Sequence, residues 1–206
     1  MEIQCDCGKF RADLTRFPSN TPGRLVCYCD DCQTYLHFLK RADLLDVNGG
    51  SEIIPAYPAD VKIIAGKELV NCTRLSPTGL FRFSTSCCHT PIANTDPKRP
   101  WAGFLRRMYT NKDPNQLDQM LGPVKASILG KYAKGTPPPG TPETLNLRGL
   151  LVVVPFILRG ILLGKAKGSP FFENGVAIVA PKVLSREERD AARASANLAP
   201  VAPAKG

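Results

Sequence analysis

Cysteine is the residue type in this chain whose spacing most clearly predicts chemistry. The chain has 206 residues and eight cysteines, and seven of the cysteines fall in three tight clusters. The clusters are Cys5-Asp6-Cys7, Cys27-Tyr28-Cys29-Asp30-Asp31-Cys32 and Cys87-Cys88, while Cys72 stands alone. Thiolates one or two residues apart can reach one metal ion from a single turn, and zinc takes four ligands in a tetrahedron. We therefore expect clusters that are distant in the chain to share a metal ion and to staple the fold.

The middle cluster predicts a different kind of site, because Cys27, Cys29 and Cys32 lie within six residues. Three thiolates can occupy three corners of a tetrahedron and leave the fourth open, which distinguishes a catalytic zinc site from a structural one. A distant cysteine at the fourth corner would instead make the site purely structural, and the spacing leaves both arrangements open. A redox dithiol at Cys29 and Cys32 is disfavoured, because no strand–helix–strand pattern surrounds them.

The composition is that of a globular protein, and its cysteines are expected to stay reduced. Hydrophobic residues make up 43% and charged residues 22% of the chain, which is enough apolar material for a core. Residues 1–10 contain Glu2, Asp6 and two cysteines rather than a basic stretch followed by an apolar one, so no secretory signal is expected. We predict a cytoplasmic protein, since clustered thiols in a reducing compartment more often bind metal or do redox chemistry than form disulfides.

The charge balance favours anionic partners. There are 27 Lys and Arg residues against 18 Asp and Glu residues, a net charge of +9, although a basic surface kept for solubility is an equal alternative. Nucleic acid is not expected, because no aromatic-basic motif of a nucleic-acid module is present. The basic residues around the third cluster are favoured as solvated surface charges over a rim that binds an anion. These residues are Arg82, Lys98, Arg99, Arg106 and Arg107.

The elements that must position the three cysteine clusters are predicted to be mostly strands. Phe10, Ala12 and Leu14 alternate with polar residues, which is typical of a half-buried strand. Further short strands are predicted at residues 52–56, 61–65, 69–73, 80–84, 91–95 and 101–109. The one helix predicted in this part of the chain covers residues 33–45. Residues 1–111 are therefore expected to form a cysteine-rich β domain.

The remaining residues, 112–206, are predicted to form a largely helical C-terminal extension. Helices are expected at residues 116–121 and 124–132, followed by a Pro- and Gly-rich linker at 134–142. Ser185 and Glu188 have the spacing of a capping box and predict another helix start. Together, the two parts predict a mainly β fold with a helical C-terminal extension, in the α+β class.

The apolar segment 150–164 needs its own interpretation. It is shorter than the roughly 20 apolar residues that span a bilayer, and Pro155 and Arg159 interrupt it. A buried helix that packs on the β domain, or across the interface of a homodimer, is the favoured interpretation, with Phe171 and Phe172 as an aromatic plug after it. The alternative is an interfacial helix anchored by Lys165 and Lys167, which would give peripheral membrane contact through residues 150–167.

Residues 3–110 resemble the glutathione-dependent formaldehyde-activating enzyme family, whose relatives include centromere protein V. Three motifs carry the resemblance, in the family's order: its opening CxCG, its CHCxxCR and the end of its CxxCGTPL. They correspond here to Cys5-Asp6-Cys7-Gly8, to Cys27-Tyr28-Cys29-Asp30-Asp31-Cys32-Gln33 and to Cys88-His89-Thr90-Pro91-Ile92. The resemblance implies a β-tent zinc-binding domain.

The resemblance also implies roles for these cysteines. Cys5, Cys7 and Cys88 match the family's structural zinc site, and Cys27, Cys29 and Cys32 match its labile zinc site, where glutathione binds. The cofactor implied is Zn2+, with one structural ion and a second, labile ion. The activity implied is that of a carbon–sulfur lyase acting on glutathione–formaldehyde adducts, an S-hydroxymethylglutathione synthase-like activity. The partner would be a small thiol or another anionic small molecule, and the alternative is a non-catalytic zinc-stabilised module that binds a protein or an anionic partner.

The sequence departs from the family pattern at several of these positions. The family's first cysteine of CxxC falls on Thr85, and we expect Cys87 to complete the structural site, although it could instead close the middle site or stay free. His89 stands in place of a glycine and is expected to be a turn residue rather than a ligand. Tyr28 replaces a histidine and Gln33 replaces a basic residue. These differences predict a divergent branch with a vicinal Cys-Cys third motif.

Overall fold

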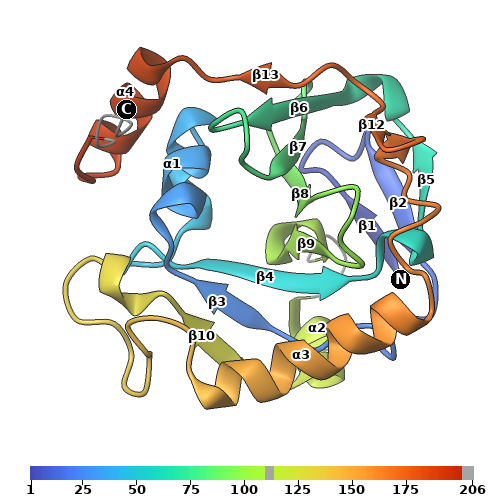
Figure 1. Ribbon diagram of the computed structural model, residues 1–206, viewed down its shortest axis with the longest axis horizontal. Coiled ribbons are helices and arrows are strands. Elements are labelled where there is room, and N and C mark those ends of the chain that lie inside the picture. The colour runs from blue at the N-terminus through green and yellow to red at the C-terminus, as the bar shows by residue number, and fades with distance from the viewer. Residues whose placement is uncertain (110–113, 201–206) are drawn as a thin grey trace.

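One long mixed sheet organises the computed structural model, which describes residues 1–109 and 114–200 (Figure 1). Within these residues its eight strands lie in the order β10-β3-β4-β9-β8-β7-β6-β13. Their bounds are β3 (Leu25–Cys27), β4 (Ser51–Ala56), β6 (Val70–Arg74), β7 (Phe81–Thr85), β8 (Pro91–Thr95), β9 (Ala102–Leu105), β10 (Ala126–Ile128) and β13 (Lys182–Val183). The central strands pair antiparallel, whereas β10 and β13 pair parallel to β3 and β6 at the two ends.

A second sheet brings the N-terminus beside the long one. It holds β1 (Glu2–Gln4), β2 (Arg11–Leu14) and β5 (Val61–Ala65) in antiparallel order. A short hairpin, β11 (Phe172–Glu173) and β12 (Val176–Ala177), follows later in the chain. The alternation predicted for β2 is confirmed, since Ala12 and Leu14 are buried.

Most predicted strands are found within a residue of their predicted bounds. Residues 61–65 and 91–95 match β5 and β8, and 52–56, 69–73 and 80–84 match β4, β6 and β7 with small shifts. The prediction of a helix at residues 124–132 is wrong, because β10 occupies residues 126–128. The edge of β3 explains this, because β10 pairs with it and satisfies its backbone groups. The pairing continues on both sides of β3, where Lys125 N donates to Arg24 O at 2.8 Å and Tyr28 N donates to Ile128 O at 3.1 Å.

The helices are α1 (Asp30–Phe38), α2 (Pro114–Leu121), α3 (Leu147–Leu162) and α4 (Arg186–Ser195). Helix α1 begins three residues before the predicted helix at 33–45 and also ends earlier, with a separate 3-10 turn at Ala42–Leu44. The capping box at Ser185 is confirmed by reciprocal bonds with Glu188, which open α4. Helix α4 packs on α1, where Arg193 Nη1 lies 2.8 Å from Asp30 Oδ2.

The core lies against the inner strands of the long sheet. Phe171 is fully buried, and its ring stacks on that of Phe83 with centroids 4.7 Å apart. Phe172 is 9% exposed and meets the Phe81 ring edge-on at 5.1 Å. The predicted aromatic plug is therefore present. Residues after 111 contribute to the common core through Phe171 and Phe172, and to the long sheet through β10 and β13. The division into 1–111 and 112–206 stays a prediction.

Helix α3 packs on the β domain through one narrow face. The Tyr57 ring stacks on Phe156 with centroids 4.3 Å apart, and the Tyr57 hydroxyl donates to Phe156 O at 2.8 Å. A Cβ atom on Gly160 would lie 2.7 Å from Tyr57 Cε1 and 2.8 Å from Pro100 Cβ, so this glycine permits the close approach. No helix among the described residues is long and apolar enough to cross a membrane.

We predict that Gly160→Val lowers the free energy of unfolding by about 1–3 kcal/mol, because the added methyl groups would overpack the contact with Tyr57 and Pro100. Denaturant unfolding of the purified chain measures this change. Leu162→Val on the same helix is the matched control; Leu162 is 85% exposed, and its replacement should change stability by less than about 0.5 kcal/mol. Equal effects of the two variants would contradict this packing of α3.

Candidate metal centres

The first centre joins two turns that are far apart in the sequence. Cys5 and Cys7 lie in the turn from β1 to β2, and Cys87 and Cys88 lie in the turn from β7 to β8. Their four Sγ atoms lie within 4.8 Å of one another. The Sγ–Sγ separations are 3.5 Å for Cys5–Cys7, 3.9 Å for Cys5–Cys87, 3.3 Å for Cys7–Cys87 and 3.7 Å for Cys87–Cys88.

These separations are those of a tetrahedral metal site. Zinc–sulfur bonds of about 2.3 Å place the corners of a regular tetrahedron about 3.8 Å apart. The four separations, 3.3–3.9 Å, fall close to that edge length. The donor set and its spacing therefore fit a four-coordinate zinc ion. The structure brings Cys87 into this cluster and not into the middle one.

Two threonine hydroxyls support the sulfur of Cys88. Although burial alone would raise the pKa of Cys88, hydrogen bonds from Thr85 and Thr90 lower it to about 5. The Thr85 Oγ1 lies 3.4 Å and the Thr90 Oγ1 3.2 Å from Cys88 Sγ. At Cys5, by contrast, burial raises the pKa. Thr85 therefore stands beside the centre as a supporting hydroxyl and not as a ligand.

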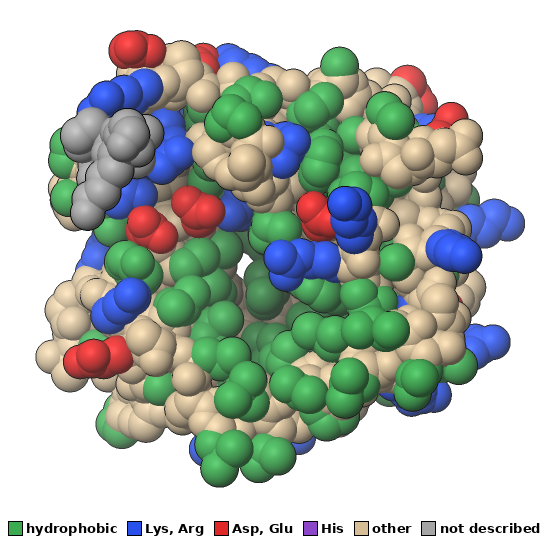
Figure 2. All heavy atoms as spheres, in the orientation of Figure 1, with side chains coloured by type: hydrophobic (Ala, Val, Ile, Leu, Met, Phe, Trp, Pro, Cys, Tyr) green, Lys and Arg blue, Asp and Glu red, His purple; other side chains and the backbone are tan. Residues whose placement is uncertain are grey.

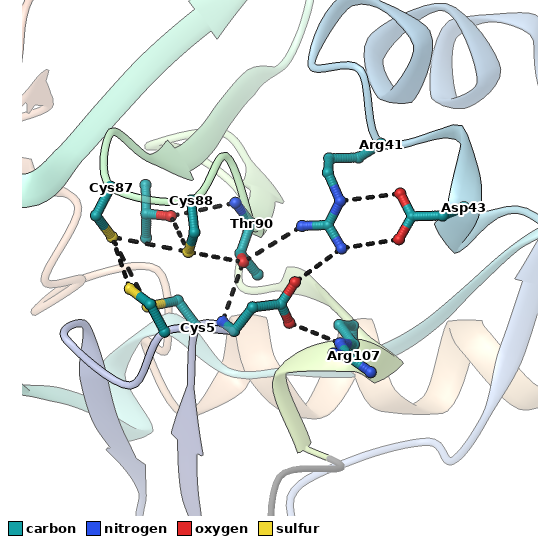
Figure 3. A network of polar contacts seen from close by, with 10 residues as sticks. Cys5, Arg41, Asp43, Cys87, Cys88, Thr90 and Arg107 are labelled. Carbon is teal, nitrogen blue, oxygen red and sulfur yellow. Dashed lines mark hydrogen bonds and ion pairs between the residues drawn. The ribbon is translucent and has the colours of Figure 1, made fainter.

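A chain of charged residues continues outward from the first centre (Figure 3). The backbone N–H of Asp6 donates to Thr90 Oγ1 at 3.1 Å. The Asp6 carboxylate binds Arg41 at 2.8 Å and Arg107 at 2.6 Å. Arg41 in turn binds Asp43 at 2.9 Å. This network fixes the turn that carries Cys5 and Cys7, and it places two guanidinium groups near a cluster of four thiols.

The second centre gathers Cys27, Cys29 and Cys32 where β3 leads into α1. Their Sγ atoms lie within 4.8 Å of one another, and no other Cys, His, Asp or Glu of the described residues joins them. Cys29 caps the helix, because its Sγ accepts from the backbone N–H of Cys32 at 3.3 Å. Cys27 is buried, whereas Cys29 and Cys32 are half-buried. This is a three-thiol cluster in which one residue is buried and two are partly accessible.

A buried arginine flanks this three-thiol cluster. Arg82, from β7, is 3% exposed, so the prediction that it is a solvated surface charge is wrong. Its Nη1 lies 4.0 Å from Cys32 Sγ, its Nη2 lies 3.5 Å from Asp31 Oδ2, and its guanidinium lies over the Tyr35 ring. Hydrogen bonds from Cys27 and Cys29, together with the charge of Arg82, hold the pKa of Cys32 well below its usual range.

Strand β7 explains why sequence analysis missed Arg82. A strand with one face in solvent would expose alternate residues, but four consecutive residues of β7, from Arg82 to Thr85, are buried. Both faces of this strand are covered, so a charged residue there needs a partner inside the protein. Its position between Phe81 and Phe83 was the one signal in the sequence.

The residues that depart from the family pattern have structural partners. Tyr28 is 1% exposed and donates its hydroxyl to Asp46 Oδ2 at 3.1 Å. Gln33 is fully buried, and its Nε2 donates to Tyr28 O at 2.8 Å and to Tyr132 O at 2.9 Å. Both side chains brace the loop that carries the three-thiol cluster. His89 belongs to neither cluster, and its φ of 52° places it in the left-handed region that favours glycine.

The eight cysteines all lie among the described residues, and they form no disulfide bond there. Cys72 is 3% exposed and belongs to neither cluster, and burial raises its pKa to about 12. Two hollows, of about 390 and 490 Å³, lie away from the clustered thiols; one has Asp46, Glu52 and Arg106 in its wall and the other has Cys72 and His89.

Comparisons with known proteins identify a family but no activity. The search of curated proteins finds no match. Among solved structures, the chain is similar to a Rhodobacter sphaeroides protein whose crystal structure is a structural-genomics target, with 15% sequence identity and a TM-score of 0.40. That alignment covers 60% of this chain and 97% of the other. The resemblance to the formaldehyde-activating family stays a prediction.

The scan against family models matches residues 1–181, which include both cysteine clusters and α3. The model is described as a family of unknown function, DUF6151. Because the match spans most of the 206 residues, this chain belongs to the DUF6151 family.

Proposed function

We propose that the protein binds two zinc ions, one in a closed structural centre and one in an open centre that binds a small thiol for carbon–sulfur chemistry. The observation that carries the proposal is the contrast between the clusters: four thiols converge in one and three in the other. Closed four-ligand sites are typical of structural zinc, and three protein ligands with one free position are typical of catalytic zinc.

Zinc is the ion that these donors favour. Soft thiolates select zinc, copper(I) or iron–sulfur clusters over hard cations, and free thiols on short turns are typical zinc ligands. The resemblance to the formaldehyde-activating family points the same way and implies a β-tent scaffold. In support, turn β1–β2 meets turn β7–β8 at the first centre, while the second centre lies at the junction of β3 and α1.

The charges around the three-thiol cluster suit an anionic fourth ligand. Three thiolates with one divalent ion carry a net charge of −1, and the Arg82 guanidinium, 4.0 Å from Cys32 Sγ, offsets it. Cys29 and Cys32 are half-buried where Cys27 is buried, so a ligand would reach the cluster from the side of these two residues. A zinc ion there would lower the pKa of a bound thiol and polarise a carbonyl oxygen.

The reaction class that fits is reversible addition of a thiol to an aldehyde. A sulfur–carbon bond forms, the carbonyl π bond breaks, and the thiol proton ends on the new hydroxyl oxygen, so no oxidant or reductant is needed. With formaldehyde and glutathione this gives S-hydroxymethylglutathione. The residues of this chain would hold and orient the thiol beside Arg82, and the gain in rate would come mainly from positioning.

We predict that the zinc-loaded protein accelerates adduct formation between formaldehyde and at least one small thiol, glutathione or a smaller one. NMR of isotopically labelled formaldehyde measures the exchange rate between free aldehyde and adduct. Cys29→Ser should abolish the acceleration, whereas Cys72→Ala, a cysteine outside both clusters, should keep it. Absence of acceleration with every thiol tested would remove the enzyme and leave the non-catalytic binding module.

We predict two zinc ions per chain, one with four sulfur ligands and one with three sulfurs and a light atom. Cys7→Ser should lower the free energy of unfolding by more than about 2 kcal/mol, because binding at a structural site contributes directly to folding. Cys29→Ser should lose one ion with a smaller loss of stability, since serine can still cap α1. Metal analysis, X-ray absorption and denaturant unfolding measure these outcomes.

Two results would contradict this assignment. The reverse ranking of Cys7→Ser and Cys29→Ser in unfolding would show that the two roles are exchanged. A reduced chain that is fully folded without metal, or one with cystines in place of thiols, would remove both centres. Cys72→Ala serves as the control and should keep two ions per chain.

We predict that Arg82→Gln releases zinc from the three-thiol centre about 10–100-fold faster, because it removes the cation that offsets the thiolates. Arg82→Lys, which keeps the positive charge, should accelerate zinc release less than Arg82→Gln does. The rate of capture by a chromogenic chelator measures the release. Arg193→Gln is the matched control, since Arg193 is also buried and bonds Asp30 on the same helix. Equal acceleration by Arg82→Gln and Arg193→Gln would show that Arg82 only braces α1.

A further inference from the structure

Helix α3 presents a continuous row of large apolar side chains to solvent. Figure 2 shows hydrophobic side chains gathered over this helix along the lower edge of the molecule. We call this row the apolar stripe: Leu147 (71% exposed), Leu150 (40%), Leu151 (67%), Val154 (40%), Leu158 (54%), Ile161 (60%) and Leu162 (85%). Exposed apolar patches of this kind mark sites of interaction.

On a helix that contributes to a protein core, the large apolar side chains face inward, whereas on α3 they face outward. Successive residues turn by about 100° around a helix, which places the whole stripe on one side. The buried side carries Gly149, Phe156 and Gly160, two of them without a side chain. Tyr57 on Phe156, and Lys165 Nζ at 2.6 Å from Asp60 Oδ1, fix this orientation. The large apolar residues are therefore held outward by contacts on the other side.

Positive charge runs along one edge of the stripe. Arg148 and Arg159 are exposed and eleven residues apart, so about three turns of helix bring them to the same edge. The segment from residue 144 to residue 172 contains no Asp or Glu. Lys167, just after the helix, is exposed as well.

The positive charge of Arg148 and Arg159 distinguishes between two candidate occupants of the apolar stripe, a second copy of the chain and an anionic lipid surface. A second copy would bring a second row of leucines, but it would also bring Arg148 and Arg159 with no acidic residue of the helix to meet them. An anionic lipid surface offers both an apolar layer and phosphate groups. Interfacial helices of this type bury the apolar face at the boundary of headgroups and acyl chains, with basic residues at the phosphates.

We propose that α3 docks the protein on an anionic phospholipid surface. The helix lies parallel to the bilayer, the stripe enters the headgroup–acyl boundary, and Arg148 and Arg159 bind lipid phosphates. Its 16 residues span about 24 Å, less than the roughly 30 Å of a hydrocarbon core, so the helix lies on the surface and does not cross it. Docking does not depend on metal in either cysteine cluster.

Flotation of the full chain with vesicles tests this proposal. The wild-type protein should float with vesicles of phosphatidylcholine and phosphatidylglycerol, more weakly with phosphatidylcholine alone, and less as salt is raised. Replacing Leu147, Leu151 and Leu162 by Gln should lower the partition coefficient by about tenfold or more. The pair Arg148→Gln and Arg159→Gln should remove most of the preference for anionic vesicles.

The control variants replace apolar or basic residues by Gln elsewhere on the surface. Val47→Gln with Val176→Gln replaces other exposed apolar residues (94% and 71% exposed), and Lys9→Gln with Lys62→Gln removes two other exposed charges. Both control pairs should bind like the wild type. The proposal is overturned if the wild-type chain does not float, or if the leucine variant floats equally well. A dimer in sedimentation velocity that this variant dissociates, without vesicle binding, would assign the stripe to a second copy.

Discussion

The convergence of four thiols at the junction of two sheets is the constraint on which the other contacts depend. Cys5 and Cys7 leave the small sheet and Cys87 and Cys88 leave the long one, yet Cys87 Sγ lies 3.9 Å from Cys5 Sγ and 3.3 Å from Cys7 Sγ. Thiolates at such distances repel one another, and neutral thiols are weak hydrogen-bonding partners. A divalent cation bound at this centre would remove the repulsion and tie the two sheets together. The bonds of Asp6 to Arg41 and Arg107 then hold one of the two turns from outside.

The second centre follows a different balance of charge. Its sulfurs belong to one short segment, so a metal ion there would fix a loop and a helix start more than the meeting of distant strands. Arg82 supplies a positive charge from β7 of the same long sheet, and its burial makes sense only beside negative partners. Asp31 is 48% exposed, so Cys32, whose Sγ lies 4.0 Å from Arg82 Nη1, is the nearest negative partner inside the protein. The same arginine thus couples β7 to the helix that carries Cys32.

Cysteine spacing predicted the positions where the clusters would form, because short chelating motifs are local features of the chain. Strands β5 and β8 were predictable for the same reason, since their apolar residues lie between clear turn residues. Arg82 and β10 were not. The role of Arg82 depends on both faces of β7 being covered, and β10 exists because the edge of β3 needs backbone partners. Both depend on contacts between segments distant in the chain, which no local pattern records.

For the apolar segment 150–164, too, the local pattern predicted the element but not which of its side chains face inward. Hydrophobicity predicted the helix, with burial as the favoured interpretation, but the side chains facing inward are Gly149, Phe156 and Gly160. The two glycines let the helix backbone approach Ile128, Tyr57 and Pro100, so contact is made by backbone and one ring instead of by leucines. Turning the helix inward would replace these close contacts with bulky side chains that have no space there. The leucines are exposed because the packed side leaves them nowhere else to lie, and their presence must then be explained by something outside the chain.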